Sequence, residues 1–550
     1  MAWERGPVLP DNASLWAIPV SAAVVVLVWR RLLAYLRYFQ QEGYEQLRFL
    51  RWTGVRPFTD PAFWLAVAAA WLSSRSAAWS AVTYVAGAAL LIAGQPDPRR
   101  SGKITLKLTW RATRVVAVAG VVASAFWFAW NVLDASGLRA LYAASALVVL
   151  LLPICLIIAN ALLAPYERHV QQGYEADAVR TLDRVRPFVI GITGSYGKSS
   201  TKSMLAHILQ FKGPTLAASG SINTLMGITR HIRENLVFGC EFMIVEMGAY
   251  GIGSIRRLCE LTPPSAAIVT AVGDMHLERF GSLENIVQAK SELAQALPSG
   301  GLLVVNADSP GALKIARTVP DRRVLLYGET SNEDLDTRLT KVEFTRQGTS
   351  FVLNTRSGEY ACFAPIHGRP IILNLAGAFT LALALGVDPE VIVASFRTLK
   401  PVSNRLEVVE DRGITWIRDA YNSNQMGFRA ALEVAAALPA QHRVLVTPGV
   451  IELGAMQAEV NQALSKSAAD VCDNTLVVSE TNHDAFVAGH RDAGRSDRLV
   501  AVPTRTDAFA WIKDHVHDGD AVILENDLPD LYEPSEGVFW TASAAGAARR

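Results

Sequence analysis

The sequence has little cysteine and almost no net charge. Its cysteines include no CxxC pair, which argues against zinc and indicates a reducing compartment; they are Cys155, Cys240, Cys259, Cys362 and Cys472. Charged residues make up 19% of the chain and balance to +1, so no strong overall field attracts nucleic acid. We therefore expect no nucleic-acid partner. A length of 550 residues is too great for one core and predicts about three or four domains.

Apolar residues, in contrast, are abundant before residue 165. Five runs approach the ~17–25 residues that a bilayer-spanning helix needs, and the second is the shortest: Ser14–Trp29, Pro61–Leu72, Ala77–Gly94, Arg114–Leu133 and Leu141–Ala164. A cleaved signal peptide would explain only the first, and buried soluble helices are the alternative for all five. The sequence predicts a membrane region over 1–165 with about five transmembrane helices.

Arginine and lysine indicate the orientation of this region. They cluster in two connecting segments, one after the first span and one before the fourth: Arg30, Arg31, Arg37, Arg48 and Arg51, then Arg99, Arg100, Lys103, Lys107, Arg111 and Arg114. Such segments face the cytoplasm, which places the N-terminus outside and everything after Ala164 inside. Residues Leu32–Trp52 mix aromatic, apolar and basic residues at helical spacing, so they form either an interfacial helix or a solvated connector.

From Pro187 short β-rich runs alternate with helical patterns, which is typical of a parallel sheet with helices on both faces. The first strands are Phe188–Ile192, Phe242–Val245, Ala267–Ala271 and Leu302–Asn306, and Arg338–Phe363 predicts smaller antiparallel strands. After the linker 400–404 a second α/β run follows, with strands near Ile414–Ile417, Arg443–Val446, Asn474–Val478 and Ala521–Leu524. We expect domains over 180–400 and 401–535, and a disordered tail over 536–550.

A glycine-rich run joins the first of these strands to a helical pattern at Thr201–Leu209. It reads Gly191-Ile192-Thr193-Gly194-Ser195-Tyr196-Gly197-Lys198-Ser199-Ser200. Backbone N–H groups of such a loop point at phosphate oxygens, so Lys198 is expected to contact the phosphates and Ser199 a magnesium ion. The glycines are offset from the common phosphate-loop spacing, and a glycine-rich turn alone is often only a turn.

Two further polar residues follow predicted strands, where open parallel sheets collect ligands. Glu246 comes directly after Phe242–Val245 and is a candidate magnesium ligand; the alternative is a carboxylate favoured at a helix N-terminus. His276 follows the next strand, and although a lone histidine is more often structural, this position favours a functional role.

Seven motifs occur in order between Arg186 and Val478, over half of the chain: GITGSYGKSST, ASGSINTLMG, IVEMGAYGIGSI, GDMHLERFGSLENIVQAKSELAQALP, VVNAD, NRLEV and RDAYNSN. They resemble the Mur ligases, and the branch that adds D-Ala-D-Ala in peptidoglycan synthesis is the most similar. The resemblance implies a phosphate-loop central domain and a Rossmann-like C-terminal domain. It also implies an ATP-dependent reaction in which a carboxylate is phosphorylated and an amine then attacks the acyl phosphate, here at the cytoplasmic side of the bacterial inner membrane.

The resemblance also implies roles for single residues. Lys198 would neutralise the transferring phosphoryl group, Ser199 and Glu246 would hold one magnesium ion, and His276 would help to hold a second. Lys290 matches a lysine that many members carry as a carbamate, whereas without the family it would be a solvated helix residue. The nucleotide contacts implied are Gly194, Ser195, Tyr196, Gly197, Lys198, Ser199, Ser200, Asn306, Asp308, Asn374, Arg405 and Asp419, with Arg405 closing from the C-terminal domain. Asn422 and Asn424 would contact the amine, unless they only form a turn.

The chain departs from the family at several positions. Thr270-Ala271, Pro370-Ile371, Asn422-Ser423-Asn424-Gln425 and the segment 524–530 differ from the usual residues, and the UDP-sugar-binding domain is replaced by membrane helices. We therefore expect the lipid bilayer as a partner, a peptide carboxylate substrate that is lipid-linked or presented by another protein, and an amino acid or dipeptide as the amine. A polyglutamate-type ligase and an ATP-switched transporter or scaffold are the alternatives. The sequence has the whole set Lys198, Glu246, His276 and Lys290, which favours catalysis over a nucleotide switch. The predicted spans contain no run of acidic residues or lysines, which argues against a transport pathway.

Overall fold

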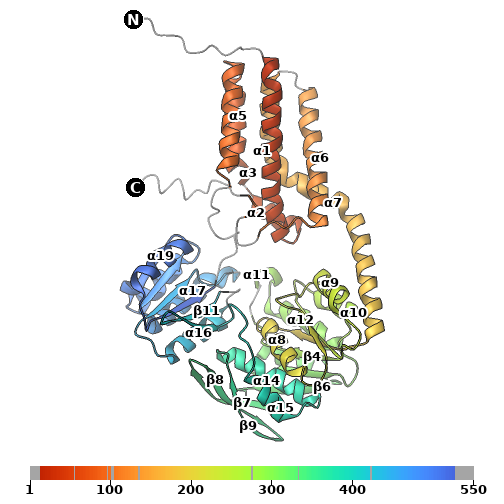
Figure 1. Ribbon diagram of the computed structural model, residues 1–550, viewed down its shortest axis with the longest axis vertical. Coiled ribbons are helices and arrows are strands. Elements are labelled where there is room, and N and C mark those ends of the chain that lie inside the picture. The colour runs from red at the N-terminus through yellow and green to blue at the C-terminus, as the bar shows by residue number, and fades with distance from the viewer. Residues whose placement is uncertain are drawn as a thin grey trace. The chain divides into compact units, whose positions relative to one another are not determined.

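The structure is a computed structural model that describes residues 13–54, 56–95, 97–100, 105–133, 137–273, 277–331, 333–420, 424–451 and 453–526. It divides into two compact units, one helical and ending at Val170, the other α/β and beginning at Gln171 (Figure 1). The predicted tail, together with His276 and Asn422, lies outside the described residues.

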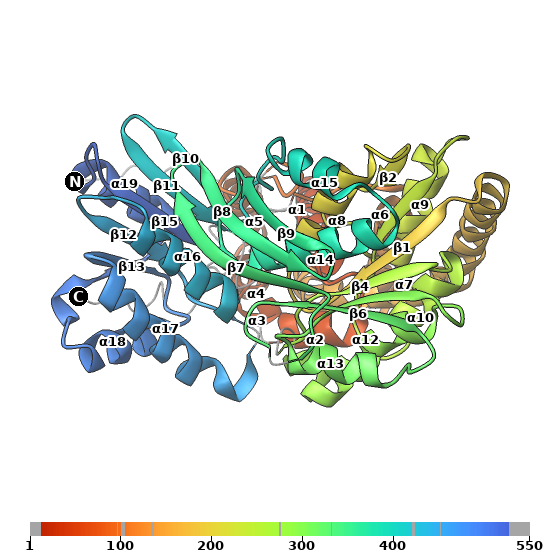
Figure 2. The same ribbon diagram turned by 90° about the horizontal axis from the view of Figure 1, so that it is seen from below.

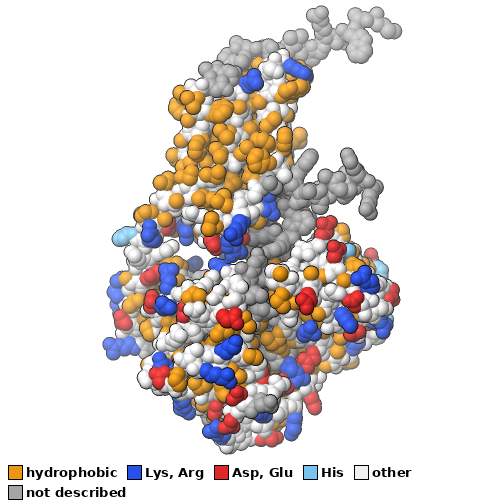
Figure 3. Space-filling view, turned by 180° about the vertical axis from the view of Figure 1, so that it is seen from behind, with side chains coloured by type: hydrophobic (Ala, Val, Ile, Leu, Met, Phe, Trp, Pro, Cys, Tyr) orange, Lys and Arg blue, Asp and Glu red, His pale blue; other side chains and the backbone are white. Residues whose placement is uncertain are grey.

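The helical unit consists of apolar helices. They are α1 (Ala13–Gln41), α2 (Gln46–Thr53), α3 (Arg56–Thr59), α4 (Pro61–Leu72), α5 (Ala77–Ala93), α6 (Trp110–Leu133) and the first part of α7 (Leu138–Val185). Three, α1 from Leu15 together with α6 and α7, are long and apolar enough to cross a membrane. The second and third predicted spans form α4 and α5, which are shorter. Figure 3 shows apolar side chains over most of the face of these helices that it views. Large apolar side chains that are exposed on the helical unit include Trp79, Val121 and Leu133.

Residues Leu32–Trp52 do not form one interfacial helix. Their first part continues α1 as far as Gln41 and is buried through Phe39, while the last part forms the separate helix α2. Arg31, directly before this segment, is also buried, and its guanidinium lies 2.9 Å from Asp60 Oδ1 with both side chains fully buried. Asp60 also caps α4 by accepting the backbone N–H of Ala62. Because removal of either partner would leave an uncompensated buried charge, this pair fixes α1 against the start of α4.

The first sheet of the α/β unit has nine strands in the order β2-β3-β1-β4-β5-β6-β7-β8-β9. From β2 to β7 neighbouring strands are parallel, and β8 and β9 add antiparallel pairs as predicted for Arg338–Phe363. The strands are β1 (Phe188–Thr193), β2 (Thr215–Ala217), β3 (Phe242–Glu246), β4 (Ala266–Val269), β5 (Leu302–Asn306), β6 (Arg323–Gly328), β7 (Thr337–Thr345), β8 (Gly348–Thr355) and β9 (Gly358–Ala364).

Helices cover both faces of this sheet, because successive strand residues point to opposite faces (Figure 2). Ile190 belongs to the core that includes α8 (Lys198–Leu209), α14 (Arg369–Ala384) and α15 (Pro389–Phe396), whereas Val189 belongs to the core on the other side. That other side holds the end of α7 and the helices α9 (Leu225–Asn235), α10 (Ser254–Leu261), α12 (Leu283–Gln295) and α13 (Pro310–Arg317); the short α11 is Leu277–Phe280. Because this core surrounds α14, the helix is buried from Asn374 to Ala382 and is mostly apolar.

The second sheet has six strands in the order β10-β11-β15-β12-β13-β14, parallel except for β10 at the edge. They are β10 (Glu407–Asp411), β11 (Ile414–Asp419), β12 (Arg443–Thr447), β13 (Asn474–Val478), β14 (Leu499–Val502) and β15 (Ala521–Glu525). Successive strand residues again point to opposite faces, so this sheet has a core on each side. One face holds α16 (Gln425–Ala437), α17 (Gln457–Val471) and α18 (His483–Asp492), and the other holds α19 (Arg505–His515). The predicted fold class, two α/β sheets after apolar helices, is confirmed.

Candidate active site

The loop between β1 and α8 contains two glycines that tolerate no side chain. Gly194 has a φ of 153° and Gly197 a φ of 77°, values that residues with a Cβ rarely adopt. A Cβ on Gly194 would collide with the Thr270 hydroxyl, and one on Gly197 with the Asn374 amide. Thr270 Oγ1 donates to the carbonyl of Tyr196 at 2.6 Å, so the end of β4 holds the loop in place. The N–H of Ser195 donates to the Ala271 carbonyl at 2.7 Å, and the loop leads from there into the N-terminus of α8, whose first-turn N–H groups are where a phosphate group would bind.

Alanine at Gly194 should distort this loop without unfolding the sheet. We expect Gly194→Ala to weaken ATP binding at least ~10-fold, because strained backbone costs about 1–3 kcal/mol and the new methyl group meets Thr270. Competition against a fluorescent ATP analogue measures the effect. Gly173→Ala is the matched control, since a Cβ there in α7 has open space around it and helix propensity favours alanine. Equal affinity of the two variants would contradict this account of the loop.

Two lysines converge on a single carbonyl of the loop. Lys198, the first residue of α8, donates from Nζ to Gly194 O at 2.9 Å, and Lys290 of α12 donates to the same oxygen at 2.8 Å. Lys290 is buried, and burial, followed by the charge of Lys198, lowers its pKa well below the usual range. Burial also lowers the pKa of Lys198; Glu246 opposes this shift and Arg405 adds to it. The alternative interpretation of Lys290 as a solvated helix residue is therefore wrong.

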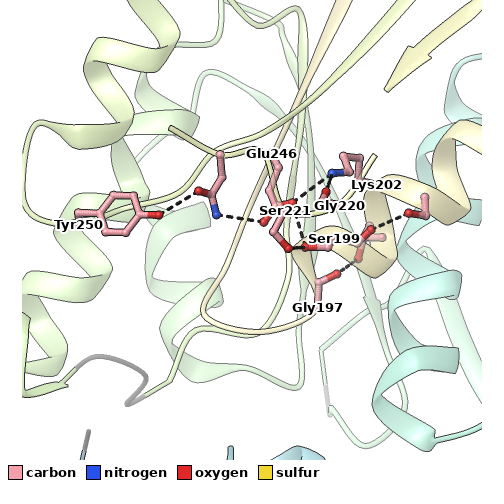
Figure 4. Close-up of polar contacts among 10 residues, drawn as sticks. Gly197, Ser199, Lys202, Gly220, Ser221, Glu246 and Tyr250 are labelled. Carbon is pink, nitrogen blue, oxygen red and sulfur yellow. Dashed lines mark hydrogen bonds and ion pairs between the residues drawn. The ribbon is translucent and has the colours of Figure 1, made fainter. Parts of the chain in front are cut away.

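Three oxygen atoms, from Ser199, Ser221 and Glu246, form a corner at the start of α8 (Figure 4). Ser199 Oγ donates to Glu246 Oε2 at 2.9 Å and lies 3.0 Å from Ser221 Oγ. Adjacent oxygen ligands of an octahedral magnesium ion, each ~2.1 Å from the metal, are about 3 Å apart. The donor set therefore fits a magnesium ion in both chemistry and spacing. Glu246 is the carboxylate that the described contacts place at this corner, and phosphate oxygens would supply further ligands.

Lys202, which the motif analysis missed, also contacts this corner. It lies one helical turn after Lys198 on α8, is buried, and places Nζ 3.3 Å from Glu246 Oε2. Lys202 also donates to the carbonyl of Gly220. Burial lowers its pKa, and Glu246 opposes the shift. The i,i+4 spacing from Lys198 is the sequence signal that would have identified it.

A cavity opens next to the loop. Its lining joins the two sheets of the α/β unit and includes Tyr196, Gly197, Ser200, Asn306, Asn374, Arg405 and Asp419. Burial raises the pKa of Asp419 to about 6, and Arg405 opposes this shift. Seven of the predicted nucleotide contacts thus line one cavity.

The remaining candidates have other positions or partners. Asn424 lines the cavity, but its Oδ1 caps α16 by accepting from Met426 N and Gly427 N, which is the turn role that the sequence left open. Asp308 accepts three backbone N–H groups of the segment 329–331 and is absent from the cavity lining. Nothing is described for His276 or Asn422.

Two family models match this unit: "Mur ligase middle domain" over residues 192–382 and "Mur ligase, glutamate ligase domain" over residues 404–525. The UDP-N-acetylmuramoyl-tripeptide–D-alanyl-D-alanine ligase of Escherichia coli (strain K12) is 32% identical over 299 residues, which cover 54% of this chain and 65% of that enzyme. The enzyme of that name from Mycobacterium bovis is 30% identical over 362 residues, covering 61% of this chain and 70% of its own.

Two solved structures are similar to the α/β unit. Crystal structure I of MurF from Acinetobacter baumannii has a TM-score of 0.59 and 25% identity, and the match covers 66% of this chain and 78% of that one. The MurF ligase of Thermotoga maritima in complex with ADP has a TM-score of 0.58 and 25% identity, and the match covers 67% of this chain and 82% of that one. The chain spans 65% of the length of the Escherichia coli relative.

Proposed function

The chain belongs to the Mur ligase family, and on that basis we propose that it is an ATP-dependent ligase that joins a carboxylate to an amine through an acyl phosphate. The proposal rests on one arrangement of side chains. Lys198, Ser199 and Glu246 meet at the phosphate loop, where the ends of β1 and β3 adjoin a cavity lined by residues of both sheets. Charge neutralisation and positioning are what phosphoryl transfer requires of a protein.

The reaction has two steps. A carboxylate oxygen of the first substrate attacks the γ-phosphorus of ATP, and the bond to the bridging oxygen breaks to release ADP. The amine of the second substrate then attacks the acyl carbon, loses a proton and expels phosphate, leaving an amide. Lys198 places its ammonium group against the oxygens of the transferring phosphoryl group, and Arg405 adds charge from the segment that leads into the second sheet. A magnesium ion held by Ser199 and Glu246 would neutralise phosphate charge.

We further propose that Lys290 is carbamylated. Its amine is buried beside a second lysine, so an ammonium ion is costly there, whereas the neutral amine can add CO₂. The amine nitrogen bonds to the carbon of CO₂ and releases one proton, giving an anionic carbamate next to Lys198. The carbamate would supply an oxygen ligand for a second magnesium ion, with His276 as a second ligand. This assignment explains why a lysine is buried at a site for cations.

We assign the substrates from the relatives' names. The amine is D-Ala-D-Ala, and the carboxylate belongs to a peptidoglycan peptide precursor, carried on UDP or on a lipid. Residues 1–165 would anchor the enzyme by several passes through the bacterial cytoplasmic membrane, with domains 180–400 and 401–535 on the cytoplasmic side. The apolar surface of the helical unit and its arginine-rich connecting segments support this placement.

Phosphate release from ATP by the detergent-purified full chain tests the proposal. D-Ala-D-Ala or single amino acids are supplied together with UDP-linked or lipid-linked muramyl tripeptide. Turnover that needs both D-Ala-D-Ala and a muropeptide would support the assignment and identify the carrier. Turnover with an amino acid and no muropeptide would instead indicate a polymer-forming ligase. Nucleotide binding without turnover on any pair would contradict a ligase of these substrates and favour a scaffold.

A further inference from the structure

Every oxygen of the Glu246 carboxylate has a defined partner. Oε2 accepts from Ser199 Oγ at 2.9 Å and lies 3.3 Å from Lys202 Nζ, while Oε1 accepts from Asn223 Nδ2 at 3.4 Å. The first two partners come from α8 and the third from the segment between β2 and α9. Since Glu246 is 2% exposed, these contacts rather than water determine which way its carboxylate faces.

The amide of Asn223 is oriented by a second residue. Its Oδ1 accepts from the hydroxyl of Tyr250 at 3.0 Å, so its NH₂ group faces Glu246. A hydroxyl can satisfy the amide oxygen, whereas a carboxylate can accept only from the amide NH₂ group, so the two contacts together define one orientation. Gly248 allows the close approach, because a Cβ there would lie 2.9 Å from Asn223 Cγ. Figure 4 shows the resulting chain of contacts from Tyr250 to Glu246.

Tyr250 itself is held in place at the surface. The guanidinium of Arg279 lies 5.0 Å from its ring centroid and donates from Nε to the Tyr250 carbonyl at 2.7 Å. The segment that carries Tyr250 is fixed at its other end, where buried Glu292 accepts the N–H groups of Gly253 and Arg256. Tyr250 is 43% exposed, so its hydroxyl connects an accessible surface to a buried carboxylate.

We propose that Tyr250 and Asn223 are positioning residues for the cation site, Tyr250 by orienting the Asn223 amide and Asn223 by orienting Glu246. The inference rests on the proposed function, since it assumes that Glu246 and Ser199 hold a divalent cation. Loss of the Tyr250 hydroxyl removes the partner of Asn223 Oδ1 and leaves the amide held by its 3.4 Å contact with Glu246 alone. The amide is then less firmly placed, so the cation ligand that it contacts is less well ordered. Partners of metal ligands typically tune affinity in this way.

Binding of Mn²⁺ in the presence of ADP, followed by electron paramagnetic resonance of free Mn²⁺ with the full chain in detergent, tests the proposal without turnover. We expect Tyr250→Phe to raise the Mn²⁺ dissociation constant about 3- to 10-fold and Asn223→Ala about 10-fold or more. The double variant should match Asn223→Ala alone, because the hydroxyl acts only through the amide. Binding of ADP without metal should be unchanged in all three.

Tyr174→Phe is the matched control. Tyr174 is also 43% exposed, and Cζ of Arg233 lies 4.4 Å from its ring centroid. Unlike Tyr250, it belongs to α7. A Tyr250→Phe protein with wild-type Mn²⁺ affinity, or effects of the two substitutions that add in the double variant, would overturn the positioning role. If ADP and Mn²⁺ bound the wild-type protein without enhancing each other, the cation site of the proposed function would fail instead.

Discussion

Lys198→Met is expected to reduce substrate-dependent phosphate release about 10³-fold or more. The ammonium group lies over the phosphate loop, held by the carbonyls of Gly194 and Ser195 at 2.9 and 3.3 Å, in a region where burial already lowers its pKa. A cation so placed stabilises the developing charge of a phosphoryl group far more than it would in water. Methionine keeps the apolar stem and most of the volume, so only the charge and its donors are removed. Steady-state phosphate release measures the loss.

A matched lysine separates this effect from a general loss of positive charge. Lys212 follows the same helix and is exposed, with Nζ 3.5 Å from the carbonyl of Gly386, and Lys212→Met should retain full activity. Both variants should melt within a few degrees of the wild-type protein, because neither creates a core cavity. A Lys198→Met enzyme with more than about a tenth of wild-type turnover would exclude Lys198 from phosphoryl transfer, since one well-placed donor alone is worth ~10²-fold or more.

Much of the candidate site was predictable because its residues are close in sequence or follow strands. Gly194 to Ser200 form one continuous loop, and Glu246 ends the strand next to β1 in the sheet. Parallel strands bring their carboxyl ends to one edge, so an acidic residue there meets the loop without any knowledge of the tertiary packing. Both sheets were predictable because short β-rich runs alternate with helical patterns along the chain, which is typical of a parallel sheet with helices on both faces.

Contacts between distant segments were not predictable in this way. Lys290 reaches Gly194 across 96 residues, and only packing of α12 against the sheet makes two lysines share one carbonyl. Asn223 and Tyr250 lie in irregular segments, where neither periodicity nor spacing determines which side chains meet. The prediction for Leu32–Trp52, an interfacial helix or a solvated connector, was wrong for a related reason. The aromatic and arginine residues of this segment are typical of a membrane interface, but neighbouring helices bury its first part.

Lys290→Ala is expected to lower phosphate release about 100-fold or more, because a buried side chain next to the transferring group is lost. Its exposed counterpart on α13, Lys314, provides the control, and Lys314→Ala should be active. Lys290→Met, which preserves volume, should be as inactive as Lys290→Ala while melting at a similar temperature. An active Lys290→Met protein would show that the amine only fills space.

Chemical rescue determines which charge Lys290 contributes. If it acts as a carbamate, acetate or propionate should restore part of the activity of Lys290→Ala, because a small carboxylate can occupy the vacated space and supply the missing anionic oxygen. If it acts as an ammonium ion, methylamine should restore activity and carboxylates should not. The wild-type protein in ¹³C-bicarbonate should then show a carbamate carbon resonance that the Lys290→Ala protein lacks. Because carbamate formation consumes the neutral amine and releases a proton, that resonance should grow as pH rises. Rescue by methylamine alone, with no such resonance, would establish Lys290 as a second phosphate-neutralising cation beside Lys198.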